Sequence, residues 1–164
     1  MAASKFDRII SDVLRREGGF IDDPADEGGR TQLGISEMAH PSAWADGKVT
    51  PEEAREIYFK KYVQWPKYDL IPDSHAVVQA QLIDFGVNSG PFVATQKLQG
   101  ILGVKADGML GPKTLAALTA RDPKDVNNRL VAERLRMLAR IVTKNPSQVK
   151  FIAGWVNRSL EFLF

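Results

Sequence analysis

Apolar residues recur at helical spacing along most of the chain, which predicts a mainly helical protein. The first such stretch covers residues 4–16, with Ser4 as the expected cap and Glu17 directly after the helix. Its apolar positions are Phe6, Ile9, Ile10, Val13 and Leu14. From residue 18 to residue 36 this periodicity is replaced by glycines, a proline and a cluster of acids. We expect a loop there, with no more than a short β-hairpin.

Start and stop signals predict the remaining helices. Thr50, Pro51 and Glu53 form the pattern of a capping box with proline in the first helical position, followed by a helix of about three turns. Ser74 is the expected cap of a helix that ends at Asn88-Ser89-Gly90-Pro91. Further helices are expected over residues 91–102, 111–120, 123–143 and 146–162. The sequence therefore predicts one predominantly helical α+β domain over residues 1–164.

Composition excludes some kinds of site. The 164 residues include no cysteine, so disulfides, thiolate metal sites and cysteine nucleophiles are excluded. His40 and His75 are the only histidines and lie in different segments, and the acids of residues 22–26 lack the spacing of a calcium loop. We therefore expect no metal and no cofactor, and we expect both histidines at the surface.

Charge is distributed unevenly. The net charge is +2, yet residues 121–164 carry 9 Lys and Arg against 4 Asp and Glu, whereas residues 1–120 carry 13 against 16. Such a basic segment, with Arg134, Arg136 and Arg140 on its expected exposed face, could be attracted to an anionic wall and weakly to a membrane. Solvated helix faces would give the same pattern.

The beginning of the chain carries no pattern of an export signal. Charged residues from Lys5 to Arg16 interrupt the first apolar stretch, and no apolar run approaches the roughly 20 residues that span a bilayer. We expect synthesis in the cytoplasm of a host bacterium, as a monomer.

The stretch EGGFIDDPADEGGRTQLGIS, residues 17–36, carries the candidate chemistry. Glycosidic cleavage needs a proton donor and usually a second carboxylate, and Glu17 and Asp26 could supply the two. Burial against residues such as Phe20 would raise the pKa of Glu17, while a polar loop would keep Asp26 ionised. Thr31 could hold the attacking water. A solvated, acid-rich turn remains the alternative.

The same stretch resembles the signature of glycoside hydrolase family 108, the N-acetylmuramidases of phages and of secretion-associated bacterial genes. The segments LIDFGVNSGP, from residue 82, and ATQKLQGILGVKADGMLGPKTLAAL, residues 94–118, are similar to the peptidoglycan-binding-like region that accompanies it. The resemblance implies a lysozyme-like, two-lobed fold, with residues 1–70 as catalytic segment and residues 71–164 as helical lobe. It implies cleavage of the β-1,4 bond between N-acetylmuramic acid and N-acetylglucosamine, with Glu17 as general acid.

Under this resemblance Asp26 and Thr31 complete the catalytic set. If Asp26 acts through water, its carboxyl group should lie roughly 6.5 to 9.5 Å from that of Glu17, as in inverting enzymes, instead of roughly 5 to 5.5 Å.

Four residues are candidates for substrate contact: Asn88, Trp65, Tyr58 and Arg30. Trp65 could stack on a sugar ring, although tryptophan more often belongs to a core. Asn88 fits a helix end equally well. Asp84, within an apolar run, is interpreted as a buried structural carboxylate.

Three other functions stay open. A lytic transglycosylase would use one acid and form an anhydro-sugar, and a peptidoglycan-binding module would have no catalysis. A nucleic-acid binder would need a groove-reading motif, and the sequence contains none. The expected use is that of an endolysin-type bacteriolytic enzyme that reaches the wall after release from the cytoplasm.

Overall fold

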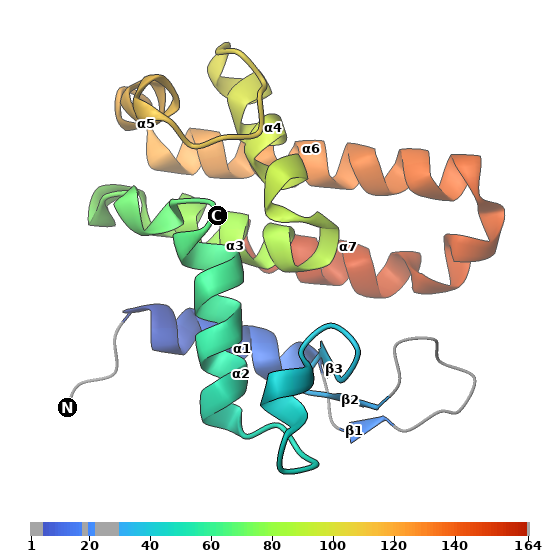
Figure 1. Ribbon diagram of the computed structural model, residues 1–164. Coiled ribbons are helices and arrows are strands. Elements are labelled where there is room, and N and C mark those ends of the chain that lie inside the picture. The colour runs from blue at the N-terminus through green and yellow to red at the C-terminus, as the bar shows by residue number, and fades with distance from the viewer. Residues whose placement is uncertain (1–4, 18–19, 22–29, 164) are drawn as a thin grey trace. The chain divides into compact units, whose positions relative to one another are not determined.

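The structure is a computed structural model that describes residues 5–17, 20–21 and 30–163 (Figure 1). The chain forms two compact units that divide between Trp65 and Pro66. The predicted single domain, with its internal division at residue 70, stays a prediction. The two units are described separately.

The first unit combines two helices with a small sheet. Helix α1 spans Lys5–Glu17 and packs against α2, Pro51–Phe59, where the Phe6 and Phe59 rings meet edge to face at 5.5 Å. The amphipathic pattern of α1 is confirmed, because Ile10, Val13 and Leu14 are buried. A 3₁₀ turn, Pro41–Trp44, precedes α2.

The predicted capping box of α2 is confirmed. The backbone N–H of Glu53 donates to Thr50 Oγ1 at 3.3 Å, and the backbone N–H of Thr50 donates to Glu53 Oε2 at 2.8 Å. Pro51 occupies the first turn, where a missing N–H removes no helical bond. After Phe59 the helix widens into a π-helical segment, Lys60–Gln64, in which Trp65 N–H donates to Lys60 O at 2.9 Å.

The sheet is antiparallel with the order β1-β2-β3: Phe20–Ile21, Thr31–Gln32 and Ile35–Ser36. Ile21 pairs with Thr31, and Thr31 pairs with Ser36. Leu33 (φ 52°) and Gly34 (φ 74°) connect β2 to β3, and positive φ at both positions is what a type I′ hairpin turn requires. The predicted loop with a short hairpin thus contains three short strands.

The second unit is helical. Two 3₁₀ turns, Tyr68–Leu70 and Asp73–His75, lead into α3, Ala76–Ser89. The other helices are α4, Pro91–Leu102; α5, Pro112–Thr119; α6, Pro123–Lys144; a 3₁₀ segment, Pro146–Phe151; and α7, Ile152–Leu160. Helices α3, α4 and α6 pack on one another, and α6 and α7 lie side by side (Figure 1). The predicted helices are confirmed to within a few residues, except that the last region begins as a 3₁₀ segment.

The core of this unit also holds polar side chains. Tyr68 is fully buried, and its hydroxyl bonds to Pro91 O at 3.0 Å and Thr95 Oγ1 at 2.9 Å, while burial raises its pKa. Gln79 Nε2 donates to Tyr68 O at 2.6 Å. Because a buried polar group without a partner is destabilising, these bonds fix the first 3₁₀ turn against α4, through Tyr68, and against α3, through Gln79.

Three predictions are wrong. Ser74 does not cap α3: it lies in the preceding 3₁₀ turn, where its Oγ is 3.0 Å from His75 Nδ1. His75 is not at the surface: it is 4% exposed, and its Nε2 is 3.1 Å from Arg121 O. Arg134 is not part of an exposed basic face: it is 2% exposed and pairs with Asp84.

Helices account for most of the described residues, and the three-stranded sheet is the β-structure among them. The predicted class, α+β and predominantly α, is confirmed. Within the described part of the chain, no helix has the length and apolar character needed to cross a membrane.

Candidate active site

Glu17 is the last residue of α1, so its backbone position is set by the end of a helix that packs on α2. The structure describes the backbone of Glu17 but not its side chain. Strand β1 starts three residues later, at Phe20. The candidate acid therefore stands between a packed helix and the first strand of the sheet. Such element boundaries allow a side chain to project beside regular structure.

Thr31 opens β2 and is half-buried. It occupies the central strand and pairs with Ile21 on one side and Ser36 on the other. The register places Thr31 opposite the strand that follows Glu17, so α1 and the sheet bring the backbones of these two residues into one part of the unit. Asp26 lies outside the described residues, and so does the predicted distance between the two carboxyl groups.

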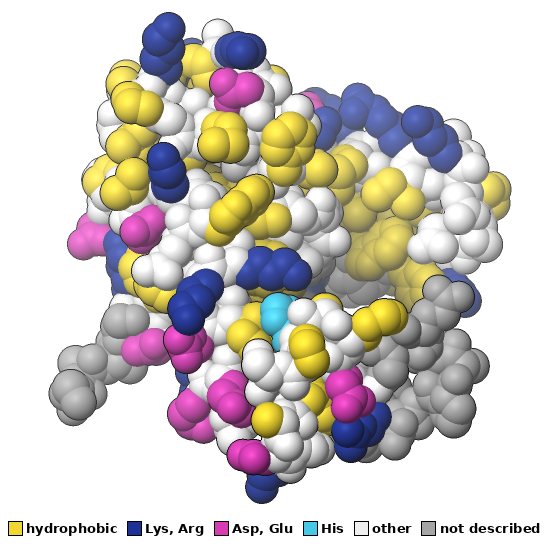
Figure 2. Space-filling model, in the orientation of Figure 1, with side chains coloured by type: hydrophobic (Ala, Val, Ile, Leu, Met, Phe, Trp, Pro, Cys, Tyr) yellow, Lys and Arg dark blue, Asp and Glu magenta, His cyan; other side chains and the backbone are white. Residues whose placement is uncertain are grey.

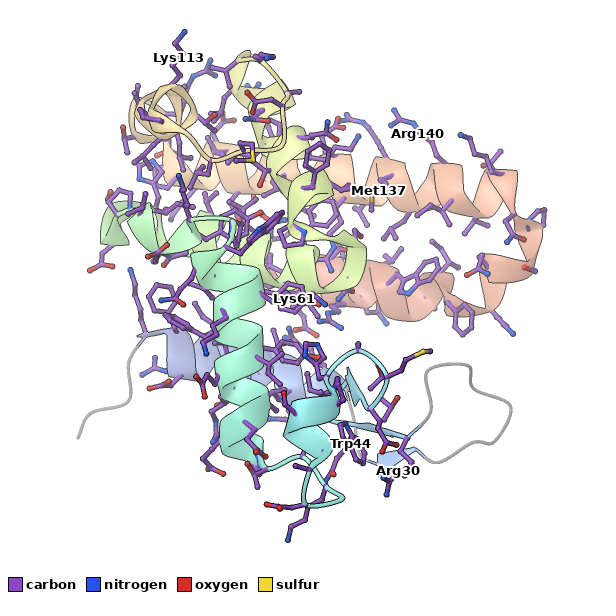
Figure 3. The ribbon with its side chains drawn as sticks, in the orientation of Figure 1. Arg30, Trp44, Lys61, Lys113, Met137 and Arg140 are labelled. Carbon is purple, nitrogen blue, oxygen red and sulfur yellow. The ribbon has the colours of Figure 1, made fainter. Side chains whose placement is uncertain are left out.

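Arg30, just before β2, binds Glu37, just after β3. Its Nε donates to Glu37 Oε2 at 3.0 Å and its Nη2 donates to Glu37 Oε1 at 2.8 Å, which makes a bidentate pair. Its guanidinium lies 5.1 Å from the centre of the Trp44 ring, next to which it is seen in Figure 3. The hydrogen bond from Arg30 holds the pKa of Glu37 below its ordinary value.

These contacts give Arg30 a structural role in the sheet. The backbone supports the same junction, because Glu37 N–H donates to Arg30 O at 2.9 Å. On the other side, Val49 N–H donates to the side chain of Gln32 at 2.9 Å. Hydrogen bonds thus connect β2, which contains Thr31, to Glu37 after β3 and to Val49 before α2. The prediction that Arg30 contacts substrate stays a prediction.

The two aromatic candidates differ in exposure. Tyr58 on α2 is 4% exposed, and its ring lies 5.2 Å from that of Tyr62, so it offers almost no surface to a sugar. Trp65 follows the π-helical segment and is 62% exposed, which leaves its ring available for stacking. The structure therefore gives Tyr58 a packing role, and the sugar contacts predicted for both residues remain untested.

Asn88 belongs to the second unit, in the last turn of α3, where its Oδ1 accepts from Arg134 Nη2 at 3.3 Å. Arg134 Nη1 is 2.8 Å from Asp84 Oδ2, and Arg158 Nε donates to Asp84 Oδ1 at 2.9 Å. Asp84 is therefore the buried structural carboxylate that its apolar surroundings in the sequence predict. Its partners on α6 and α7 were missed, although Arg134 lies four residues from two buried leucines, Leu130 and Leu138.

The described side chains include no cluster of three or more His, Asp or Glu that could hold a metal ion. The first unit contains Glu17, Arg30, Thr31, Tyr58 and Trp65, and the second contains Asn88. Of the predicted catalytic residues, the structure describes Glu17, by its backbone at a helix end, and Thr31, on β2. Acid–base catalysis uses groups of these kinds.

Comparison with known proteins adds four findings. Residues 10–90 match the family model described as Glycosyl hydrolase 108, and residues 93–160 match the model described as Predicted Peptidoglycan domain. The solved structure of SagA from Brucella abortus is 33% identical to this chain, with a TM-score of 0.69, and the match covers 96% of this chain and 94% of that one. Among curated proteins, none matches the chain.

Proposed function

Since this chain belongs to the glycosyl hydrolase 108 family, we propose that it is an N-acetylmuramidase, which hydrolyses the β-1,4 bond between N-acetylmuramic acid and N-acetylglucosamine. The family and the peptidoglycan domain of residues 93–160 make it a glycoside hydrolase that acts on peptidoglycan. The proposal adds the bond that is cleaved and the residues that cleave it.

In the proposed mechanism Glu17 protonates the glycosidic oxygen as its bond to the anomeric carbon of N-acetylmuramic acid breaks. A water molecule on the opposite face of the ring bonds to that carbon and gives a proton to Asp26, and Thr31 helps to hold this water through its hydroxyl. The transition state resembles an oxocarbenium ion, and the negative charge of Asp26 stabilises it. This division of labour requires a protonated Glu17 and an ionised Asp26 in the same active enzyme.

One observation carries the proposal: Glu17 ends α1, and the sheet that holds Thr31 begins three residues later. A general acid must be held in position while charge develops on the sugar, and the packing of α1 on α2 fixes the backbone that carries Glu17. The sheet, fastened by the Arg30–Glu37 pair, gives Thr31 an equally fixed backbone.

Substitution of Glu17 by Gln tests this role. The variant keeps the size and hydrogen-bonding capacity of the side chain but cannot donate the proton, so the rate of wall lysis should fall by roughly two or more orders of magnitude. Turbidity of purified cell walls measures the rate, and circular dichroism checks the fold. Glu56→Gln is the matched control, because Glu56 is an exposed acid of the same unit whose only described ion pair is with Lys60. Lysis by a folded Glu17→Gln variant at the control rate would remove Glu17 from the mechanism.

The products test the reaction type. Hydrolysis gives reducing-end sugars, whereas a lytic transglycosylase gives anhydro-sugars that are one water lighter, so mass spectrometry of digested walls separates the two. If Asp26 activates water in a single displacement, the first product has the α configuration, which NMR can record before mutarotation. A β product would instead assign Asp26 a role other than activating water for an inverting displacement.

We also propose an endolysin-type role, in which the enzyme reaches the wall after release from the cytoplasm of its host. Production in bacteria with and without a co-expressed membrane pore tests this. Lysis should require the pore, and lysis without it would contradict this route.

A further inference from the structure

The second unit contains a groove that the catalytic proposal does not use. It lies between α4 and α6, has a volume of about 570 Å³, and is lined by residues of these two helices only. Small-molecule and short-peptide sites commonly have volumes of roughly 300 to 1,000 Å³. In Figure 2, Lys and Arg side chains form a row along α6. The groove is therefore large enough for a small ligand and stands beside positive charge.

Gly100 has no side chain, and this leaves the space of the groove unfilled above α4. This glycine lies inside α4, where glycine is less favourable than alanine. Apart from its two chain neighbours and the nearby backbone of its own helix, no atom lies within 4 Å of the position that a Cβ would occupy, and Gly100 is not among the described residues with positive φ. Neither packing nor backbone conformation therefore requires glycine here. Its effect is to keep space above the helix, and Ala132 opposite and Ile101 beside it give the floor a small apolar surface.

Charged side chains stand around this floor. Glu133 is half-buried, lying 3.6 Å from the ammonium of Lys97 and 2.7 Å from Nη1 of Arg136. The hydrogen bond from Arg136 lowers the pKa of Glu133, which keeps this carboxylate ionised and the two cations in place. A guanidinium has five N–H donors, and the contact with Glu133 uses one of them. Arg129 adds a third cation to the lining.

We propose that this groove binds the stem peptides of peptidoglycan, which are short peptides with free carboxylates and small apolar side chains. Lys97 and Arg136 would receive the carboxylates, and the floor at Gly100 and Ala132 would receive alanine methyl groups. Glu133 would accept a hydrogen bond from a ligand amine or amide. The proposal rests on the proposed function insofar as peptidoglycan is the substrate, and it assigns the peptide part of that polymer to a site of its own.

The composition of the groove distinguishes this ligand from other anions. A polyphosphate or nucleic acid bound in the groove would place its negative charges next to the carboxylate of Glu133, which lines the groove, and these like charges would repel each other. Where stem peptides are attached, the lactyl carboxyl group of N-acetylmuramic acid is an amide, so the glycan strand itself offers these three cations no charge. A peptide with both carboxylates and N–H donors matches the mixed charges, because hydrogen bonds in which one partner is ionised are stronger than those between neutral groups.

The test is binding of soluble tetrapeptides to the full chain, measured by isothermal titration calorimetry. The peptides have the sequence L-alanine, γ-D-glutamate, a diamino acid and D-alanine, with either diaminopimelate or lysine as the diamino acid. Replacing both Lys97 and Arg136 by Gln should weaken binding by about 100-fold, which corresponds to two bonds of tenfold each. A peptide with amidated carboxylates should lose affinity to a similar extent.

Two further variants separate binding from folding. Gly100→Leu fills the groove without changing charge, and leucine is the better helix former, so it should abolish peptide binding while the unfolding midpoint stays the same or rises. Replacement of Lys113 and Lys144, two exposed lysines outside the groove lining, by Gln removes the same charge and should leave binding unchanged. The proposal is overturned if neither peptide binds, if Gly100→Leu binds normally, or if inorganic phosphate binds in the groove and the peptides do not.

Failure of this inference can be told from failure of the proposed function. Glycan strands stripped of their peptides contain the bond that the proposed muramidase cleaves. The Gly100→Leu variant should release reducing ends from these strands at the rate of the unaltered protein. Absence of cleavage by the unaltered protein would contradict the muramidase proposal, whereas peptide binding is read from calorimetry alone.

Discussion

Removal of the Asp84 carboxylate should destabilise the second unit strongly. The side chain of Asp84 is 2% exposed, and it pairs with Arg134, 3% exposed, at 2.8 Å and with Arg158, 16% exposed, at 2.9 Å. The three residues connect α3, α6 and α7. In Asp84→Ala, two cations lose their counter-charge in a place that water hardly reaches.

The expected loss follows from the burial of the pair. Breaking a buried ion pair by removing one partner destabilises a protein by about 3 to 5 kcal/mol. Two groups soften the effect here, since Asn88 Oδ1 accepts from Arg134 at 3.3 Å and the Arg134 guanidinium lies 5.2 Å from the centre of the Phe85 ring. We therefore expect about 3 kcal/mol, a large share of the roughly 5 to 15 kcal/mol that stabilises a typical domain.

Urea denaturation followed by circular dichroism measures this loss. Asp125→Asn is the matched control, because the Arg129–Asp125 pair has a similar distance, 3.0 Å, but is about half exposed, and such pairs contribute at most about 1 kcal/mol. The double variant Asp84→Ala/Arg134→Met should recover part of the loss, since it also removes one of the two cations that pair with Asp84. An Asp84→Ala variant as stable as the control would refute the argument from burial.

Three further predictions concern local structure and pH. Thr50→Ala removes the cap of α2 and should lower the free energy of unfolding by about 1 kcal/mol in urea denaturation; no change would contradict the role of the cap. Gly108→Ala should lower the free energy of unfolding by about 1 to 2 kcal/mol, because φ at this position is 74°. Overlap of the new Cβ with the Phe92 ring should lower it further. Adding Phe92→Ala should reverse the loss due to overlap but not the loss due to φ. Hydrogen bonds from Gln99 and Met109 lower the pKa of Asp107, so its stabilising effect should be present above the unfolded pKa of about 3.9 and disappear as the pH falls through the folded value. Asp107→Asn should therefore reduce the acid dependence of the melting temperature, and an unchanged dependence would contradict this assignment.

The sequence predicted most of the helices because their signals are local. The capping box at Thr50 depends on side chains three residues apart. Gly90 and Gly103 directly follow α3 and α4 and have φ of 85° and 72°. Glycine adopts positive φ without a steric penalty, so a glycine in the sequence indicates where a helix ends. The predicted resemblance to the family is confirmed by the match of residues 10–90 and by the similarity to SagA, which also support the predicted lysozyme-like class.

Features that depend on distant residues were not predicted. The register of the sheet requires Leu33 to adopt a positive φ, and leucine carries no signal for that conformation. Asp84 meets partners 50 and 74 residues further along the chain, a separation that periodicity does not encode. Arg134 was misassigned for a different reason: charge was given more weight than the four-residue spacing that places it between Leu130 and Leu138 on a buried face.

For the candidate site, too, the contacts between residues far apart in the sequence were not predicted. The sequence predicted Glu17, Asp26 and Thr31 as catalytic residues through the resemblance of their stretch to the family signature, and this stays a prediction. The structure adds the helix end that carries Glu17 and the strand that carries Thr31. It also adds the supports, such as the contact of Arg30 with Glu37, which no motif displays.

The proposed catalytic site and the proposed peptide groove would have different effects on the degradation of peptidoglycan. Glu17 lies in the first unit and the α4–α6 groove in the second, and the two units are joined covalently between Trp65 and Pro66. Once the groove holds a stem peptide, the chance that Glu17 meets a glycosidic bond is set by an effective concentration instead of by free diffusion. Interactions in the groove are the same before and during bond cleavage, so they can lower KM on intact walls but cannot raise kcat. Under both proposals the groove affects KM on intact walls and the catalytic residues affect kcat, because the proposed catalytic residues, and not the groove, would contact the bond whose charge changes in the transition state.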